Sequence, residues 1–188
     1  MTRQDRKPQS LKELMESGGG LRGFTWPDAT SDFDMAILRD GTWTHQGTPI
    51  TREKLVKLFA TVLQRDEDGA YWLVTPGERG RITVEDAPFV AVALDATSQT
   101  GCLRFRTNLD YWVTAGPDHA IRVEEDPQTG EPSPYIHVRD GLDALINRSV
   151  FYELVELAET RTENGCEVLG VESDGAFFPL GHAPNGEA

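Results

Sequence analysis

The feature that most constrains the fold of this chain is an internal repeat. A shift of 96 positions superposes Ile50-Thr-Arg52 on Ile146-Asn-Arg148 without a gap. The same shift aligns five further identities, Leu58 with Leu154, Arg65 with Arg161, Glu67 with Glu163, Gly69 with Gly165 and Leu73 with Leu169. Upstream, a shift of 100 superposes Arg39-Asp-Gly41 on Arg139-Asp-Gly141. We expect one strand-helix-strand unit used twice, and the alternative is a coincidence between two ordinary β-α-β pieces.

Each repeat combines one amphipathic helix with strands. Apolar side chains recur at helical spacing after Thr51 and again after Asn147, and both of these residues are suitable helix caps. Runs rich in β-forming residues, bounded by Gly, Pro, Asp or Asn, predict strands elsewhere. These runs are 35–39, 71–75, 89–94, 102–107, 111–114, 121–124, 135–139, 167–171 and 177–180.

The pattern predicts an α+β fold with four segments. Ser10-Leu-Lys-Glu13 is a capping box, so we expect a short helix from Leu11 to Gly18, followed by a flexible glycine joint. Asp86-Ala-Pro88 is a plausible joint between the repeats. The expected divisions are an N-terminal helix and joint over 1–20, a first unit over 21–87, a second and larger unit over 88–183, and a tail over 184–188.

The charge excludes two classes of partner. The chain carries 18 Lys and Arg against 31 Asp and Glu, a net charge of −13. Residues 1–87 hold 12 basic and 14 acidic side chains, whereas residues 88–188 hold 6 and 17. Polymeric nucleic acids and anionic membrane surfaces are bound by clustered cations, so neither is an expected partner. Without an apolar run or a cysteine motif around Cys102 and Cys166, we expect a cytoplasmic protein with reduced thiols.

The repeated arginines are the leading candidates for a binding site. Arg52 and Arg148 stand where helices are expected to begin, although free N–H groups and the helix dipole favour an anion there. One interpretation is an ion pair with Asp40 or Asp140 of the preceding turn. The other is that each arginine and its helix N-terminus bind an external anion such as a phosphate.

Other polar and aromatic residues lie near these elements in the sequence. Trp43 and Trp72 are candidates to stack on a ring, although a half-buried structural role is the commoner one for tryptophan. His45 and Asn108 are candidates to contribute hydrogen bonds. Arg139, in the second Arg-Asp-Gly turn, completes the predicted ligand-binding set.

No motif indicates catalysis, a metal or a cofactor. Gly18-Gly-Gly20-Leu-Arg-Gly23 matches a dinucleotide-binding loop by letter, but no strand precedes it and no helix pattern follows it. The four histidines lack the spacing of metal ligands. We therefore expect a protein that is not an enzyme and holds no metal or cofactor, with a hydrolase built from scattered His and carboxylate groups as the least favoured reading.

The motifs resemble those of domain of unknown function family 1285, over nearly the whole chain from Leu21 to Leu180. The residues that carry the resemblance are Asp40-Gly-Thr-Trp43-x-His45, Pro49-Ile-Thr-Arg52, Tyr71-Trp-Leu-Val-Thr-Pro76, Asp86-Ala-Pro-Phe89, Val138-Arg-Asp-Gly-Leu142 and Arg148-x-Val-Phe-Tyr-Glu-Leu-Val155. The resemblance implies a duplicated α+β fold whose C-terminal part is superficially similar to pleckstrin-homology-like domains. It also implies a nucleotide-like ligand at the domain interface and a role in signal transduction.

The sequence thus favours a cytoplasmic, non-enzymatic sensor or adaptor that holds a small anionic, nucleotide-like ligand between its two units. The alternative is a protein–protein interaction module without a small ligand, in which the arginines are structural and the acidic second half meets a basic partner.

Overall fold

The computed structural model describes residues 30–96, 101–127, 129–163 and 166–182. The predicted N-terminal helix at residues 11–18 and the glycine joint lie outside these ranges. The described chain forms two compact units. The first comprises the described residues up to Leu38 together with Thr42–Glu85, and the second comprises Arg39–Gly41 and the described residues from Asp86 onward.

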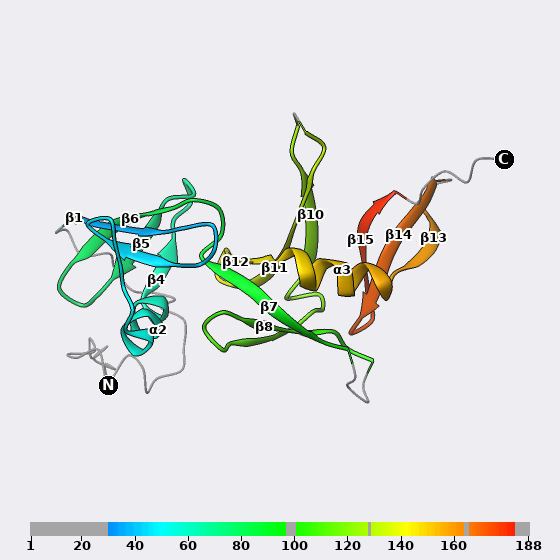
Figure 1. Ribbon diagram of the computed structural model, residues 1–188, viewed down its shortest axis with the longest axis horizontal. Coiled ribbons are helices and arrows are strands. Elements are labelled where there is room, and N and C mark those ends of the chain that lie inside the picture. Colours follow the sequence, from blue (N-terminus) through cyan, green and yellow to red (C-terminus); the bar gives the residue numbers. More distant parts are fainter. Residues whose placement is uncertain (1–29, 97–100, 128, 164–165, 183–188) are drawn as a thin grey trace, which may run out of the picture. The chain divides into compact units, whose positions relative to one another are not determined.

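The first unit is a six-stranded sheet with one helix (Figure 1). The strand order is β3-β2-β1-β6-β5-β4, and β1 and β6 pair in parallel while the other neighbours are antiparallel. The elements are β1 (Thr30–Ile37), β2 (Trp43–His45), β3 (Thr48–Pro49), α2 (Glu53–Thr61), β4 (Leu63–Arg65), β5 (Tyr71–Val74) and β6 (Arg79–Val84). The Arg-Asp-Gly turn joins β1 to β2, as the repeat predicts.

Helix α2 packs its apolar stripe against the sheet. Val56 and Ala60 are buried, and the ring of Phe59 stacks on Trp43 with a centroid distance of 6.1 Å. The predicted cap at Thr51 is wrong, because the N-cap is Arg52 and its side chain makes no capping hydrogen bond. Glu53 in the first turn supplies the negative charge that the helix dipole favours there.

The second unit contains another six-stranded sheet and a separate three-stranded sheet (Figure 1). Their orders are β10-β11-β12-β7-β8-β9 and β13-β14-β15, and β12 and β7 are the parallel pair. The elements are β7 (Phe89–Asp95), β8 (Arg104–Thr107), β9 (Trp112–Thr114), β10 (Ile121–Glu125), β11 (Pro132–Arg139), β12 (Leu142–Ile146), α3 (Arg148–Glu156), β13 (Glu159–Glu163), β14 (Cys166–Ser173) and β15 (Ala176–His182).

Helix α3 begins where the sequence predicts. The Asn147 side chain accepts a hydrogen bond from the Val150 amide at 2.9 Å and so caps the helix. Val150 and Leu154 point into the core of the unit. Arg148 is the first residue of α3, whereas Arg52 is the N-cap residue directly before α2.

The two units repeat the order of their elements, which confirms a duplicated α+β arrangement that consists mostly of strands. Strands β1 and β2, helix α2 and strands β4, β5 and β6 correspond to β11, β12, α3, β13, β14 and β15. The pairing differs, however. On β1 the edge opposite β2 pairs with β6, whereas on β11 the edge opposite β12 pairs with β10. Strands β13–β15 therefore form a sheet of their own.

A buried serine ties this small sheet to the rest of the second unit. Ser173, at the end of β14, is 1% exposed. Its hydroxyl accepts a hydrogen bond from the Leu103 amide at 2.8 Å and donates one to the Ala115 carbonyl at 2.7 Å. Leu103 directly precedes β8, and Ala115 directly follows β9. The Ser173 side chain therefore satisfies two backbone groups next to strands of the larger sheet.

We expect Ser173→Ala to lower the free energy of unfolding by about 2 to 4 kcal/mol, because two buried backbone groups lose their partner. Urea unfolding measures the change. The matched control is Ser31→Ala at an exposed position of β1, for which a change within about 0.5 kcal/mol is expected. Equal effects of the two substitutions would show that the Ser173 link does not hold the sheets together.

Candidate functional site

The second unit contains a cavity of about 300 Å³ at the start of α3, lined by both polar and apolar side chains. Its walls come from the Arg39 turn, the first half of β11, the end of β12 and the first turn of α3. The charged and hydrogen-bonding members are Arg39, Arg148, Glu131, Ser133, Asn147 and Tyr152, and the apolar members include Pro132, Pro134 and Phe151. Two arginines that are 109 positions apart in the sequence thus line one cavity.

Arg148 is held loosely. Its Nη2 lies 3.3 Å from Glu131 Oε1, and the two side chains are 74% and 65% exposed. An ion pair this exposed contributes about 0 to 1 kcal/mol to stability. The partner anticipated for this arginine was Asp140, but Asp140 lies 3.9 Å from Arg139 instead. Glu131 is therefore a weakly bound carboxylate at a position that another anion would be able to take.

Arg39, whose side chain is 65% exposed, makes its contacts along one edge of the guanidinium. Its Nε lies 3.3 Å from Asp86 Oδ2, and its Nη2 donates to the Ser133 hydroxyl at 3.5 Å. Asp86 is only 12% exposed. The ion pair engages Nε, while Nη2 lies near Ser133, which also lines the cavity.

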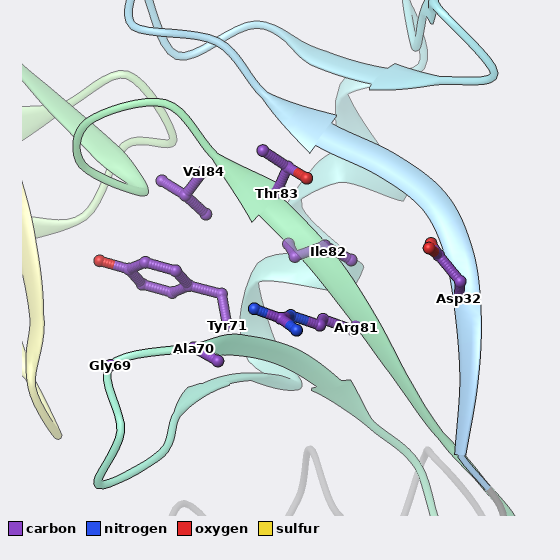
Figure 2. A pocket seen from close by; sticks show the side chains of 8 residues that line it. All are labelled: Asp32, Gly69, Ala70, Tyr71, Arg81, Ile82, Thr83 and Val84. Atoms are coloured by element: carbon purple, nitrogen blue, oxygen red, sulfur yellow. The ribbon is translucent and has the colours of Figure 1, made fainter.

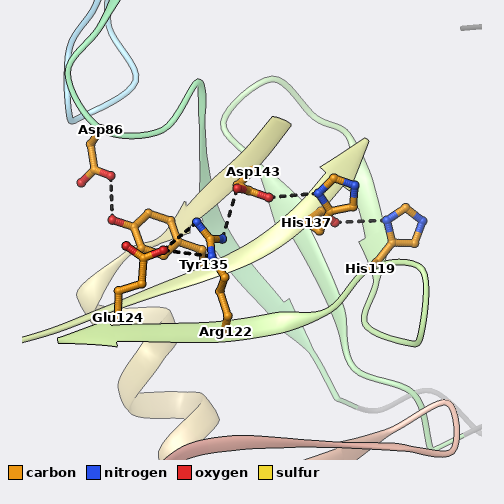
Figure 3. Close-up of polar contacts among 7 residues, drawn as sticks. All are labelled: Asp86, His119, Arg122, Glu124, Tyr135, His137 and Asp143. Atoms are coloured by element: carbon orange, nitrogen blue, oxygen red, sulfur yellow. Dashed lines mark hydrogen bonds and ion pairs between the residues drawn. The ribbon is translucent and has the colours of Figure 1, made fainter. Parts of the chain in front are cut away.

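Asp86 is positioned in turn by Tyr135. The Tyr135 hydroxyl donates to Asp86 Oδ1 at 2.8 Å, and the tyrosine ring lies under the Arg122 guanidinium at 4.4 Å (Figure 3). Tyr135 is 8% exposed. Burial, followed by the hydrogen bond to Asp86 and the negative charge of that carboxylate, raises the pKa of Tyr135 to about 12. The phenol is therefore a permanent donor at neutral pH.

The same network continues across three strands of the sheet, β10, β11 and β12 (Figure 3). Arg122 Nη1 lies 3.1 Å from Asp143 Oδ2, and His137 Nδ1 lies 3.0 Å from Asp143 Oδ1. His119 Nδ1 is 3.1 Å from the His137 carbonyl oxygen, and the two imidazole rings stack at 6.3 Å. These contacts cross-link the strands behind Asp86 and so support the position of Arg39.

The first unit holds four of the seven sequence-predicted site residues, and the two tryptophans among them have structural contacts. Trp43 is 1% exposed and stacks on Phe59 in the core, so its ring has no open face. The Trp72 indole donates to Asp66 Oδ2 at 2.8 Å, and the Arg79 guanidinium lies 4.7 Å from the Trp72 ring. The Trp72 hydrogen bond lowers the pKa of Asp66. His45 and Arg52 are exposed.

The other three predicted residues belong to the second unit. Asn108 joins backbone segments, because its side chain accepts from the Val90 amide at 3.1 Å and donates to the Gly41 carbonyl at 3.4 Å. Gly41 has φ +84°, and a Cβ there would lie 2.4 Å from Asn108 Nδ2. Arg139 pairs with Asp140. Of the predicted set only Arg148 lines the cavity at the start of α3, and ligand binding by all seven residues stays a prediction.

Sequence reasoning missed Arg39, Ser133 and Tyr152. The signal for Arg39 was present, since the repeat aligns Arg39 with Arg139. What the sequence does not show is that residues 39–41 fold with the second unit, which brings Arg39 rather than Arg139 to the cavity.

A second hollow, of about 430 Å³, lies in the first unit (Figure 2). Its side chains come from β1, β5, β6 and the turn before β5. Asp32 and Arg81 stand at paired positions of the parallel strands β1 and β6, so the hollow contains one charge of each sign. It lacks the excess of cationic groups that distinguishes the cavity at α3.

Within the described ranges, no group of three or more His, Cys, Asp or Glu side chains is placed to hold a metal ion. Likewise, no helix within these ranges has the length and apolar character needed to cross a membrane.

These features define a two-unit α+β protein with a cationic cavity in its second unit. The family models for the N-terminal and C-terminal domains of DUF1285, a protein family of unknown function, match residues 25–87 and 88–180. The chain belongs to this family.

Two solved structures of DUF1285 proteins resemble the chain. The protein from Silicibacter pomeroyi DSS-3 is 43% identical, with a TM-score of 0.75 over 90% of this chain and 94% of that one. The protein from Shewanella baltica OS155 is 28% identical, with a TM-score of 0.51 over 65% of this chain and 90% of that one. No curated protein matches the chain.

The raised pKa of Tyr135 predicts a loss of stability at alkaline pH. In the unfolded chain the phenol ionises near pH 10, whereas the folded chain retains the proton to about pH 12. The folded state thus binds more protons between these values, and the free energy of unfolding falls as pH rises from about 10 to 12.

We expect this fall to be shallower in Tyr135→Phe, as measured by urea unfolding at a series of pH values. Tyr152→Phe, at an exposed tyrosine, is the matched control; identical slopes in wild type and Tyr135→Phe would contradict the assignment.

Proposed function

We propose that the second unit binds a small phosphorylated, nucleotide-like molecule in the cavity at the start of α3, with Arg39 and Arg148 as the phosphate ligands. The observation that carries this proposal is the meeting of two arginines at one cavity beside a helix N-terminus. Guanidinium groups present paired N–H donors that match phosphate oxygens, and the helix dipole adds to their attraction.

The two arginines have different parts in this proposal. Arg39, paired with Asp86 through Nε, provides one guanidinium for the phosphate. Arg148, exposed and weakly paired with Glu131, exchanges one carboxylate for a ligand phosphate. Tyr152, an exposed aromatic residue of α3 at the same cavity, offers a ring for stacking.

A non-enzymatic, cytoplasmic sensor or adaptor is the function that fits such a site best, with a place in signal transduction. The alternative is a module that binds a basic protein partner through its acidic surface, without a small ligand. A pleckstrin-homology-like character of the second unit and a ligand contact to Arg52 both stay predictions.

Thermal melting of the full chain separates these functions. A nucleotide at 100 times its dissociation constant adds about 2.7 kcal/mol to stability, which raises Tm by about 5 to 10 °C for a chain of this size. The panel consists of nucleoside mono-, di- and triphosphates, with a sugar phosphate and inorganic phosphate as probes that lack the base. The absence of a shift with every compound at millimolar concentration would favour the protein-partner alternative.

Substitutions locate the binding site. We expect Arg148→Gln and Arg39→Gln to reduce the ligand-induced rise in Tm by most of its size. Arg106→Gln is the matched control, because Arg106 is another partly exposed arginine of this unit, pairs with Asp110 at 3.0 Å and does not line the cavity. Binding that survives both cavity substitutions would place the ligand elsewhere. Arg148→Gln is the cleaner test, since Arg39→Gln also removes a partner of buried Asp86.

A further inference from the structure

The hollow of the first unit, about 430 Å³, has the size of a small-ligand site, since such sites span roughly 300 to 1,000 Å³ (Figure 2). Its lining comes from strands β1 and β6, the start of β5 and the turn before β5. Charged, polar and apolar side chains line it together. What the hollow binds therefore depends on how its charges are placed.

Two opposite charges in this hollow do not pair with each other. Asp32 of β1 and Arg81 of β6 stand at paired positions, and neighbouring strands lie about 4.8 Å apart. Opposite charges on neighbouring strands commonly pair. Within the described ranges, however, neither side chain forms an ion pair. In Figure 2 the Arg81 guanidinium extends toward the side of the hollow where Tyr71 lies, away from Asp32. The hollow thus presents a cation and an anion at separate positions.

The carboxylate of Asp66, in the turn before β5, is engaged elsewhere. Its Oδ1 accepts a hydrogen bond from the Ala70 amide at 2.7 Å, and its Oδ2 accepts one from the Trp72 indole at 2.8 Å. The Trp72 hydrogen bond is the main cause of the lowered pKa of Asp66, and the positive charge of Arg81 adds a smaller part through space. Asp66 therefore holds the turn that lines the hollow and leaves the Arg81 guanidinium to another anion.

The carboxylate of Asp32 is oriented through one oxygen. Its Oδ1 accepts a hydrogen bond from the Asp34 amide at 2.9 Å. Among the described residues, its Oδ2 has no hydrogen-bond or ion-pair partner. Asp32 and Arg81 are both exposed, so a molecule from solvent reaches both charges.

We propose that this hollow binds a free amino acid. Arg81 binds the carboxylate of the ligand, Asp32 accepts hydrogen bonds from its ammonium group, and its side chain lies against Tyr71 and Val84. A ligand with a single charge leaves one of the two protein charges unmatched, whereas a zwitterion matches both. Tyr71 and Val84 are half-buried, so an apolar ligand side chain removes further apolar surface from water. This ligand is distinct from the phosphorylated molecule proposed for the second unit.

Calorimetric titration of the full chain with the common L-amino acids, each at millimolar concentration, tests the proposal. Each amino acid that binds is compared with its decarboxylated amine and its deaminated acid, which for L-phenylalanine are phenethylamine and 3-phenylpropanoate. We expect the amino acid to bind about tenfold or more tightly than either analogue, because each analogue lacks one charge contact. The absence of binding by every amino acid, or equal affinity for an analogue with one charge, would overturn the proposal.

Substitutions place the ligand in the hollow. Asp32→Asn and Arg81→Gln are each expected to weaken amino-acid binding by about tenfold or more. Glu67→Gln and Lys54→Gln are the matched controls, because they change the charge of the same unit equally at exposed positions that do not line the hollow. Asparagine keeps an acceptor for the Asp34 amide, and the Tm of each unliganded variant checks that it is folded. Undiminished binding in either hollow variant, or an equal loss in the controls, would show that the ligand is not held by these two charges.

Discussion

Each edge of a β-strand pairs with one neighbour, and this constraint decides how the repeated sequence is used. On β1 the edge opposite β2 receives β6, so the first repeat closes its own six-stranded sheet. On β11 the corresponding edge receives β10, which belongs to the strands that precede the second repeat. Strands β13–β15 cannot join that edge and form a separate sheet, to which Ser173 attaches them.

This arrangement also builds the candidate site. Because β10 lies beside β11, Arg122 of β10 covers the ring of Tyr135, and the buried phenol holds Asp86 by a hydrogen bond. Asp86 then fixes Arg39 through its Nε. The position of a cavity arginine thus depends on a strand pairing that has no counterpart in the first unit. Duplicated sequence therefore provides two similar scaffolds, while the cavity of the second unit is also supported by β10, a strand outside the repeat.

Sequence patterns predicted what is local and missed what depends on distant partners. Asn147 as a helix cap, and the register of the helical stripe of α3, follow from residues within one turn of each other. The apolar spacing of α2 continues through Leu63, so periodicity alone did not separate the helix from β4. Strand β6 escaped prediction because its first half, Arg79-Gly80-Arg81, lacks the β-branched and aromatic residues that mark a strand. Trp43 illustrates the same limit, since an indole that lies in the core and one that stacks on a ligand have the same local sequence.

The net charge argues against anion binding only if the charges act at long range. Residues 88–188 carry 17 acidic against 6 basic side chains, but exposed charges more than about 8 Å apart are largely screened at physiological ionic strength. What an incoming phosphate meets at the cavity is therefore Arg39, Arg148 and Glu131. Glu131 pairs with the guanidinium of Arg148, so in the proposed site this one acidic side chain competes with a phosphate for that arginine. The proposed site therefore favours a ligand with more than one negative charge, because only a multivalent anion gains from both arginines while it displaces a single carboxylate.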